Sequence, residues 1–285
     1  MILKEQYTLS NGVQIPKLGL GTWLIPNDEA AAAVRSAVEI GYRHIDTAQA
    51  YANEEGVGEG LRTCGLPRNE VFVTTKVAAE LKDYASAAAS IDESLRKLGL
   101  DYIDLVIIHS PQPWMEFRGP KRYFEENREV WCALEDAYEA GKVKAIGVSN
   151  FLRDDLQNLL DGCRIKPMVN QILLHTGQTP LKLLAFCKEN GILIEAYSPI
   201  AHGAALKDAR LKEMASRYGA SVPQLCIQYT LQLGAVSLPK STNPAHIRSN
   251  ADLNFSMSED DMEALRTIKL DYGDDSSFPV FNEAE

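Results

Sequence analysis

The chain has 285 residues, a length that fits two domains of about 150 residues each or one barrel of about 250 residues. Hydrophobic residues make up 45% of the composition and charged residues 24%, which excludes collagen, coiled coils and disordered chains. The formal net charge of −10 argues against nucleic acid and anionic membranes as partners.

The chain opens with a predicted β-hairpin over Tyr7–Ile15, in which Asn11 and Gly12 are expected to form a two-residue turn. After it, short apolar runs alternate with longer stretches of helical periodicity. The apolar runs are nearly continuous and rich in Val, Ile and Leu, as in parallel strands that are buried on both faces. The eight strand candidates are Lys17–Trp23, Tyr42–Asp46, Val71–Lys76, Leu105–His109, Ala145–Asn150, Met168–Gln171, Ile192–Tyr197 and Ala235–Lys240.

Between the strands, apolar residues recur at helical spacing, and several of these stretches end at glycine. Asn27 or Asp28 is predicted to cap a first helix that ends at Gly41. Thr179 with Pro180 is predicted to start another helix, which Gly191 ends. The remaining predicted helices end at Gly99 and Gly141 or lie over Leu206–Tyr218, Val222–Leu233 and Ser258–Ile268.

This alternation of strands and helices, without a break in composition, predicts a single (β/α)8 TIM barrel over residues 1–285, preceded by the hairpin. The main competitor is an open, doubly wound sheet, which usually carries Gly-x-Gly-x-x-Gly after its first strand. The candidate Gly19–Leu24 lacks the third glycine, and Gly56–Gly60 does not fit the pattern. The barrel is therefore the preferred fold class.

Five cysteines are scattered along the chain without a Cys-x-x-Cys pair, which indicates a reducing compartment and no zinc site. The first residues lack the apolar core of a signal peptide, and no apolar run approaches the roughly 18 residues of a membrane span. We therefore expect a soluble, cytoplasmic protein that binds neither membranes nor nucleic acid. A monomer is the expected oligomeric state.

Polar residues stand where several predicted strands end. Asp46 ends one strand and is followed by Tyr51, Lys76 ends the next, and His109 follows Leu105–Ile108. Taken singly, each has an ordinary structural interpretation, such as a helix cap, a solvated charge or a packed core residue. The carboxyl ends of barrel strands share one rim, however, so these side chains are expected to converge there.

The four residue types also fit together chemically. A tyrosine with its ordinary pKa near 10 is a weak acid at neutral pH, and a neighbouring ammonium is expected to lower that pKa. Asp46 would keep Lys76 charged, and His109 could donate a hydrogen bond to a substrate oxygen or relay a proton. Such a set suits protonation of an oxygen that is becoming an alkoxide, as in carbonyl reduction, and it needs no metal.

A set of short motifs runs along the chain. The motifs are Leu18-Gly19-Leu20-Gly21-Thr22-Trp23, Gly41-Tyr42-Arg43-His44-Ile45-Asp46-Thr47-Ala48 with Tyr51, Thr75-Lys76, the stretch Asp101–His109, Ala145-Ile146-Gly147-Val148-Ser149-Asn150, Asn170-Gln171 and Leu238-Pro239-Lys240-Ser241. Each motif is weak alone, whereas their order and spacing together are specific. In these motifs the chain resembles the aldo-keto reductase family from end to end.

The resemblance implies a barrel that binds NADPH in extended form and reduces aldehydes or ketones. At matching positions, Tyr51 would be the general acid, Lys76 and Asp46 would tune it, and His109 would orient the carbonyl. Hydride transfer would be the cofactor's chemistry, while the protein supplies position and field. The residues implied to contact the cofactor are Gly21, Thr22, Asp46, Ser149, Asn150, Gln171, Tyr197, Ser198, Ile200, Lys240, Ser241, Thr242, His246 and Asn250.

The segment Lys240–Asn250 bears on the choice of nicotinamide cofactor. It contains fixed positive charges and hydroxyls but no carboxylate, and Asn243-Pro244 resembles a helix start, as suits a phosphate. Many family members have Arg where this chain has His246, and Glu where it has Ser249. A neutral His cannot grip a phosphate as a bidentate Arg does, so the hypothesis is NADP(H) with a weaker preference and some use of NAD(H).

The substrate wall is the least informative part of the sequence. Trp23, Tyr51, His109 and Trp114 are expected to contact a small aldehyde or ketone, with Phe117 and Phe281 as further aromatic candidates. The acidic tail Asp271–Glu285 is predicted to be mobile until ligand binds.

Two other functional classes fit the sequence less well than a reductase. A non-catalytic, cofactor-binding relative acting as a regulatory or structural subunit would have no evident need for Asp46, Tyr51, Lys76 and His109 together. A barrel hydrolase or isomerase would be expected to carry paired catalytic carboxylates or a His-x-His metal pair at its strand ends, and neither is present.

Overall fold

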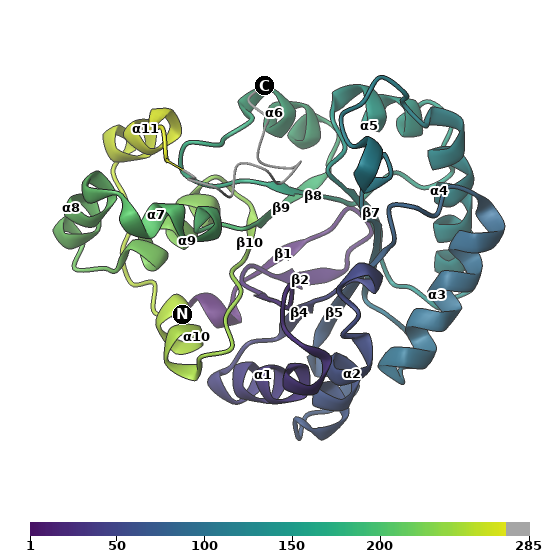
Figure 1. Ribbon diagram of the computed structural model, residues 1–285, viewed down its shortest axis with the longest axis horizontal. Coiled ribbons are helices and arrows are strands. Elements are labelled where there is room, and N and C mark those ends of the chain that lie inside the picture. Colours follow the sequence, from purple (N-terminus) through teal and green to yellow (C-terminus); the bar gives the residue numbers. More distant parts are fainter. Residues whose placement is uncertain (272–285) are drawn as a thin grey trace.

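The computed structural model describes residues 1–271 and shows eight parallel strands surrounded by helices (Figure 1). The strands neighbour one another in chain order, and backbone contacts of Leu18 with Ser237 and of Gly21 with Lys240 join the first strand to the last. The predicted (β/α)8 barrel is thereby confirmed. Its strands are β3 (Leu20–Gly21), β4 (His44–Asp46), β5 (Phe72–Val77), β6 (Leu105–Ile108), β7 (Ile146–Ser149), β8 (Val169–Leu173), β9 (Leu193–Tyr197) and β10 (Val236–Leu238).

The predicted N-terminal hairpin is present as the antiparallel pair β1 (Gln6–Thr8) and β2 (Gln14–Pro16), but its turn differs from the prediction. Leu9 N donates to Val13 O, which leaves a three-residue loop of Ser10, Asn11 and Gly12. Gly12 alone in this loop has a positive φ, of 89°. The Asn11 side chain explains the longer loop, because it accepts from Val13 N and donates to Lys144 O ahead of β7.

Strand register brings the polar residues to one end of the barrel. Asp46 pairs with Thr74 across β4 and β5, and Ser149 pairs with Gln171 across β7 and β8. In every strand from β3 to β8, all residues are buried. Because the strands are parallel, the residues that end them face a common opening.

The helices pack around these strands, and several end where the sequence places glycine. Gly41 ends α1 with φ 119°, and Gly99 ends α3 with φ 64°, a backbone region that glycine enters without strain. The helices are α1 (Asn27–Ile40), α2 (Glu54–Thr63), α3 (Tyr84–Leu98), α4 (Phe124–Glu139), α5 (Arg153–Leu160), α6 (Leu181–Glu189), α7 (Ala204–Lys207), α8 (Ala209–Arg217), α9 (Val222–Gln232), α10 (Pro244–Asn250) and α11 (Glu259–Thr267).

Three helical features differ from the predictions. Pro26 precedes α1 as its N-cap, and Asn27 Oδ1 instead accepts from Gly56 N of α2 at 2.9 Å. The helix predicted over Leu206–Tyr218 is two helices, because Asp208 caps the start of α8 with its carboxylate. The short helix α5 was not predicted.

Helix α2 was also missed, because its three glycines resemble a loop rather than a helix. The structure shows why they are there. A Cβ at Gly56 would lie 2.0 Å from Asn27 O of α1, and a Cβ at Gly58 would lie 2.2 Å from Leu98 O of α3. The glycines therefore permit a backbone-to-backbone approach of α2 to both neighbours.

Apolar side chains form one large core around the strands and a second cluster under α7, α8, α9 and α11. Across the described part of the chain, the helices are too short or too polar to cross a membrane. The expected aromatic Phe281 and the predicted mobile tail after Asp271 lie outside the described residues.

Candidate active site

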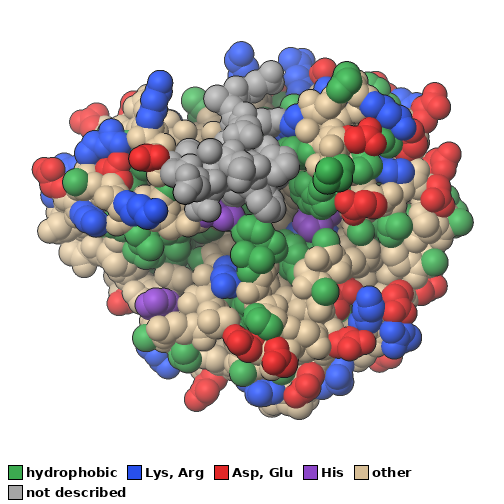
Figure 2. All heavy atoms as spheres, in the orientation of Figure 1, with side chains coloured by type: hydrophobic (Ala, Val, Ile, Leu, Met, Phe, Trp, Pro, Cys, Tyr) green, Lys and Arg blue, Asp and Glu red, His purple; other side chains and the backbone are tan. Residues whose placement is uncertain are grey.

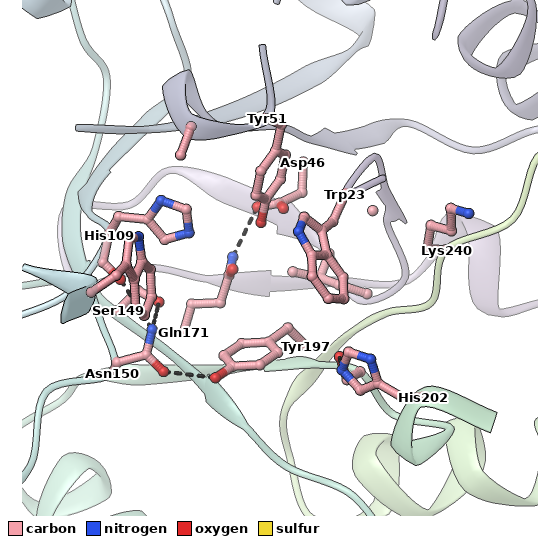
Figure 3. Close-up of a pocket in the computed structure, with 15 residues that line it drawn as sticks. Trp23, Asp46, Tyr51, His109, Ser149, Asn150, Gln171, Tyr197, His202 and Lys240 are labelled. Atoms are coloured by element: carbon pink, nitrogen blue, oxygen red, sulfur yellow. Dashed lines mark hydrogen bonds between the residues drawn. The ribbon is translucent and has the colours of Figure 1, made fainter. Parts of the chain in front are cut away.

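A cavity of about 300 Å³ opens at the carboxyl ends of the strands. Figure 2 shows hydrophobic side chains gathered near the middle of this face, with most charged side chains toward its edge. The cavity wall comes from the strand ends and the loops after them (Figure 3). Its lining residues are Gly21, Trp23, Asp46, Ala50, Tyr51, His109, Trp114, Ser149, Asn150, Gln171, Tyr197, Ser198, His202, Leu238 and Lys240.

The structure brings Asp46, Lys76 and Tyr51 together as predicted. Lys76 Nζ donates to Asp46 Oδ1 at 2.6 Å, to Thr47 O at 2.8 Å and to the Tyr51 hydroxyl at 3.3 Å. Lys76 is fully buried beneath the cavity, whereas Tyr51, in a 3-10 turn after β4, lines it. Burial opposes the charge on Lys76, but Asp46 and Tyr51 beside it outweigh burial and raise its pKa.

One electrostatic expectation was wrong in its net direction. Burial raises the pKa of Tyr51 above its ordinary value, and the Asp46 carboxylate adds to that rise. Lys76 does lower the pKa of Tyr51, as expected, but not enough to offset burial. The phenol is therefore held firmly in its protonated form, which is the form that can donate a proton to a substrate oxygen.

His109 follows β6 and faces Tyr51 across the cavity (Figure 3). Its ring meets the Tyr51 ring edge to face, with centroids 5.6 Å apart, and meets the Trp114 ring in the same way at 5.1 Å. Burial, with a further contribution from Lys76, lowers the pKa of His109 well below its ordinary value, so the imidazole is neutral. Its Nδ1 is sealed without a hydrogen-bond partner among the described residues, so Nε2 is the nitrogen available to a ligand.

A fixed amide, that of Asn150, borders the cavity beside Ser149 (Figure 3). Asn150 follows β7 and has a positive φ of 62°, a conformation that Asn tolerates better than most residues. Its Nδ2 donates to His109 O and to Ser149 Oγ, each at 3.0 Å, while its Oδ1 accepts from the Tyr197 hydroxyl at 2.7 Å. These contacts join the ends of β6, β7 and β9 into one rigid edge.

A second amide, that of Gln171 on β8, reaches inward under the same cavity. Its Nε2 donates to Asp46 Oδ2 at 2.8 Å and to Glu195 Oε2 at 3.0 Å. Glu195 lies on β9 with no exposed surface, and burial together with the nearby Asp46 raises its pKa to about 8. His44 of β4 lies beyond it, with Nε2 3.8 Å from Glu195 Oε1 and 3.0 Å from Thr74 Oγ1.

Aromatic side chains stand at the entrance. Trp23 and Trp114, which the sequence predicts to contact substrate, both line the cavity. Phe117 lies behind Trp114, with ring centroids 5.5 Å apart, and borders a separate small cavity rather than this one. Met115, which follows Trp114 in the chain, is almost wholly exposed.

A second cavity, of about 630 Å³, continues from the first toward α10. Trp23, Ser198, His202 and Lys240 line both cavities, so the two form a continuous cleft. Predicted cofactor residues that line the second cavity alone are Ile200, Ser241, His246 and Asn250.

Two predicted cofactor residues lie elsewhere. Thr22 is fully buried, and its hydroxyl donates to Asp46 O at 2.9 Å, which fixes the backbone of Asp46. Thr242 is exposed and lines neither cavity. At the start of α10, Asn243 N donates to Ser241 Oγ and Asn243 Oδ1 accepts from Ala245 N, so these groups are already paired within the turn.

Three site residues escaped the sequence analysis. Glu195 had a signal, because it is a carboxylate in the middle of an otherwise apolar predicted strand, Ile192–Tyr197. Thr47 contributes only its backbone oxygen to Lys76, for which no side-chain pattern exists. His202 lies in a short 3-10 turn, bonds to Ser198 Oγ at 2.7 Å and packs edge to face on Trp23 at 5.1 Å.

Comparisons with known proteins agree with this geometry. The model of the aldo/keto reductase family matches residues 17–269. Glyoxal reductase of Bacillus subtilis is 41% identical over 271 residues, covering 94% of each chain. The 9,11-endoperoxide prostaglandin H2 reductase of Trypanosoma cruzi is 43% identical over 286 residues, covering 97% of each chain.

Solved structures give the same result. An aldo/keto reductase from Brucella melitensis superposes with a TM-score of 0.85 at 39% identity, covering 92% of this chain and 98% of that one. The aldo-keto reductase of Bombyx mori, solved in complex with NADP, gives a TM-score of 0.83 at 32% identity. The match covers 98% of this chain and 99% of that one. With the family model, the relatives and the site in agreement, this chain belongs to the aldo/keto reductase family of oxidoreductases.

Proposed function

We propose that the protein reduces an aldehyde or ketone to an alcohol with NADPH, and that Tyr51 is the proton donor. The observation that carries this proposal is the position of Lys76 Nζ, 2.6 Å from Asp46 and 3.3 Å from the Tyr51 hydroxyl at the base of a cavity that His109 also lines. The neutral His109 donates a hydrogen bond from Nε2 to the carbonyl oxygen and directs it toward Tyr51. Tyr51 then passes its proton to that oxygen, and Lys76 stabilises the phenolate that remains.

The residues present fit a nicotinamide cofactor. Gln171 lines the cavity, and its Oε1 has no hydrogen-bond partner among residues 1–271, so it can accept from a carboxamide. Tyr197 borders the same space, and an aromatic ring in this position suits stacking on a nicotinamide. When bound, the reduced cofactor supplies the hydride, and the continuous cleft toward α10 gives room for the rest of a dinucleotide.

Basic residues along the cleft toward α10 favour a phosphorylated cofactor. Lys240 and His246 line the second cavity, Arg248 follows on α10, and Lys240–Asn250 contains no carboxylate that would select an unphosphorylated ribose. The Bombyx mori relative was solved with NADP, which supports the same assignment. Because His246 cannot form the charged, bidentate contact of an Arg, we propose that NADH also serves as a weaker cofactor.

The substrate class follows from the entrance. Trp23 and Trp114 line a cavity whose base carries the polar groups of Asp46, Tyr51 and His109, as suits a short carbonyl compound with an apolar or small side group. The Bacillus subtilis relative is named for glyoxal, a small dialdehyde. A binding-only role is disfavoured, since the buried Lys76 and Asp46 would then serve no reaction at the cavity.

The test is the loss of reduced-nicotinamide absorbance with a panel of small aldehydes, dicarbonyls and ketones, using each cofactor in turn. We expect turnover of several aldehydes with kcat/KM higher for NADPH than for NADH. Cofactor binding without turnover of any carbonyl would instead favour the binding-only role, and a ratio in favour of NADH would overturn the cofactor assignment.

A further inference from the structure

We propose that Glu195 is a positioning residue, which fixes the amide of Gln171 so that its carbonyl oxygen faces the carboxamide of the cofactor. The inference rests on the proposed function in one respect, namely that a nicotinamide occupies the cavity. The orientation of the Gln171 amide itself does not depend on which reaction the protein catalyses.

The hydrogen bonds of Gln171 admit one orientation of its amide. Both hydrogens on Nε2 are used, one toward Asp46 Oδ2 at 2.8 Å and one toward Glu195 Oε2 at 3.0 Å. A reversed amide would place Oε1 against oxygens of both carboxyl groups, without a donor on Asp46 to satisfy it. A single hydrogen bond fixes the position of an amide nitrogen, whereas two in different directions also fix the plane of the amide.

Glu195 supplies the second of these bonds from outside the cavity. It lies beside Gln171 in register across β8 and β9, has no exposed surface and is not among the lining residues. The titratable groups that face it are Asp46 and His44 from β4 and Lys76 from β5. Glu195 therefore cannot touch a substrate, and its hydrogen bond with Gln171 ties it to a side chain that lines the cavity.

Burying the Glu195 carboxyl lowers the stability of the fold, and packing alone does not explain why a carboxyl is kept at this position. Burial and the neighbouring Asp46 raise the pKa of Glu195 to about 8, so it carries a proton at neutral pH. Its Oε1 has no hydrogen-bond partner among the described residues, and Nδ1 of His44 is likewise unpaired. In either protonation state, Oε2 remains an acceptor for Gln171, and this is the contact that the residue makes well.

The fixed orientation of Gln171 makes the cavity prefer a ligand that donates a hydrogen bond. With Nε2 held from below, Gln171 offers the cavity an acceptor and no donor. An acceptor recognises the amino group of a carboxamide and gains nothing from a methyl ketone in its place. Glu195 thus contributes to discrimination between a true nicotinamide and analogues that lack the amino group.

The test compares the binding of NADP⁺ with that of its 3-acetylpyridine analogue, in which a methyl ketone replaces the carboxamide. Quenching of tryptophan fluorescence reports binding without turnover, because Trp23 and Trp114 line the cavity. The wild-type protein should bind NADP⁺ about fivefold more tightly than the analogue, which is the difference that one neutral hydrogen bond provides. In Glu195→Leu this ratio should fall at least threefold, and Glu195→Gln, which keeps an acceptor oxygen, should restore it.

Glu54→Leu is the matched control. Glu54 is also a buried carboxyl with a raised pKa, but it accepts from the Thr75 hydroxyl at 2.7 Å and does not contact Gln171. Its variant should keep the wild-type ratio. A fall of less than threefold in a folded Glu195→Leu protein, or an equal fall in Glu54→Leu, would overturn the inference.

A measurement on the wild-type protein covers the case in which Glu195→Leu does not fold. The side-chain amide signals of Gln171, assigned by their loss in Gln171→Leu, should show two distinct protons that exchange slowly with solvent in the ligand-free protein. An amide that exchanges like an exposed Gln would refute the proposed orientation. If the wild type binds neither nucleotide, the proposed function fails, while these signals still decide how Gln171 is held.

Discussion

The ammonium of Lys76 lies 2.6 Å from a carboxylate oxygen of Asp46, and both side chains are at least 95% buried. The backbone oxygen of Thr47 and the hydroxyl of Tyr51 complete the surroundings of the ammonium. Charges taken this far from water are stable only as a pair, so the fold and the chemistry depend on the same contact.

Removing Lys76 should therefore destabilise the protein as well as inactivate it. Lys76→Met leaves the Asp46 carboxylate buried without its partner, and we expect a loss of about 3–5 kcal/mol in the free energy of unfolding. Urea denaturation measures this loss. The double variant Lys76→Met with Asp46→Asn removes both charges and should be more stable than Lys76→Met alone; equal stabilities would mean that the pair is not energetically coupled.

Tyr51→Phe should abolish proton donation while keeping the ring. Carbonyl reduction should fall by about two to four orders of magnitude in kcat, the range attributed to general acid catalysis. Cofactor affinity, measured by fluorescence quenching, should stay within about twofold, because the hydroxyl is directed toward Lys76. Retained turnover would reassign the acid, with His109 on the facing wall as the first candidate.

Glu195→Gln should change how stability depends on pH. Folding raises the pKa of Glu195 from its ordinary 4.5 to about 8, so between these values the folded protein holds a proton that the unfolded chain has released. Wild-type stability therefore falls as pH rises through this window. The variant lacks this titration. As the pH rises through the window, its free energy of unfolding should therefore increase relative to that of the wild type by on the order of 1 kcal/mol per pH unit.

Urea denaturation at pH 5 and at pH 8 measures this difference. Buried neutral histidines make stability depend on pH in the opposite direction. Burial lowers the pKa of His44 to about 3, so the wild type and the variant should both lose stability as the pH falls below 6.5. A constant difference between variant and wild type from pH 5 to pH 8 would mean that Glu195 does not hold its proton.

His246→Arg should sharpen cofactor preference. The longer, permanently charged side chain would stand at the cleft near Lys240, where a charge-assisted contact with a phosphate is worth about tenfold in affinity. We expect kcat/KM for NADPH to rise about tenfold relative to NADH, with NADH kinetics nearly unchanged. His246→Gln is the neutral control and should leave the ratio within about threefold. An unchanged ratio in His246→Arg would place the phosphate elsewhere.

How far the sequence could predict this site depends on the kind of signal each residue leaves. Asp46, Lys76 and His109 are polar residues at the ends of apolar runs, and the geometry of a parallel barrel brings such ends together, so their meeting was predictable. The net pKa of Tyr51 was not, because it depends on how much water the folded cavity excludes.

Other parts of the structure could be missed for physical reasons of the same kind. The glycines of α2 lower helical propensity, and only the packing of α2 against Asn27 and Leu98 makes that helix favourable. The oxygen of Thr47 that holds Lys76 belongs to the backbone and leaves no mark in the sequence. Glu195 did leave a mark, as a lone carboxylate in an apolar strand, but its partner Gln171 is 24 residues away along the chain.

The N-terminal hairpin lies at the amino ends of the barrel strands, away from the carboxyl ends that form the site. Ile15 is fully buried, Asn11 is tied to Lys144 ahead of β7, and Figure 1 shows β1 and β2 across the middle of the barrel. Lys144 precedes β7, whereas the candidate catalytic residues lie at the carboxyl ends of the strands. Loss of the Asn11 contact is therefore expected to lower stability without altering the site.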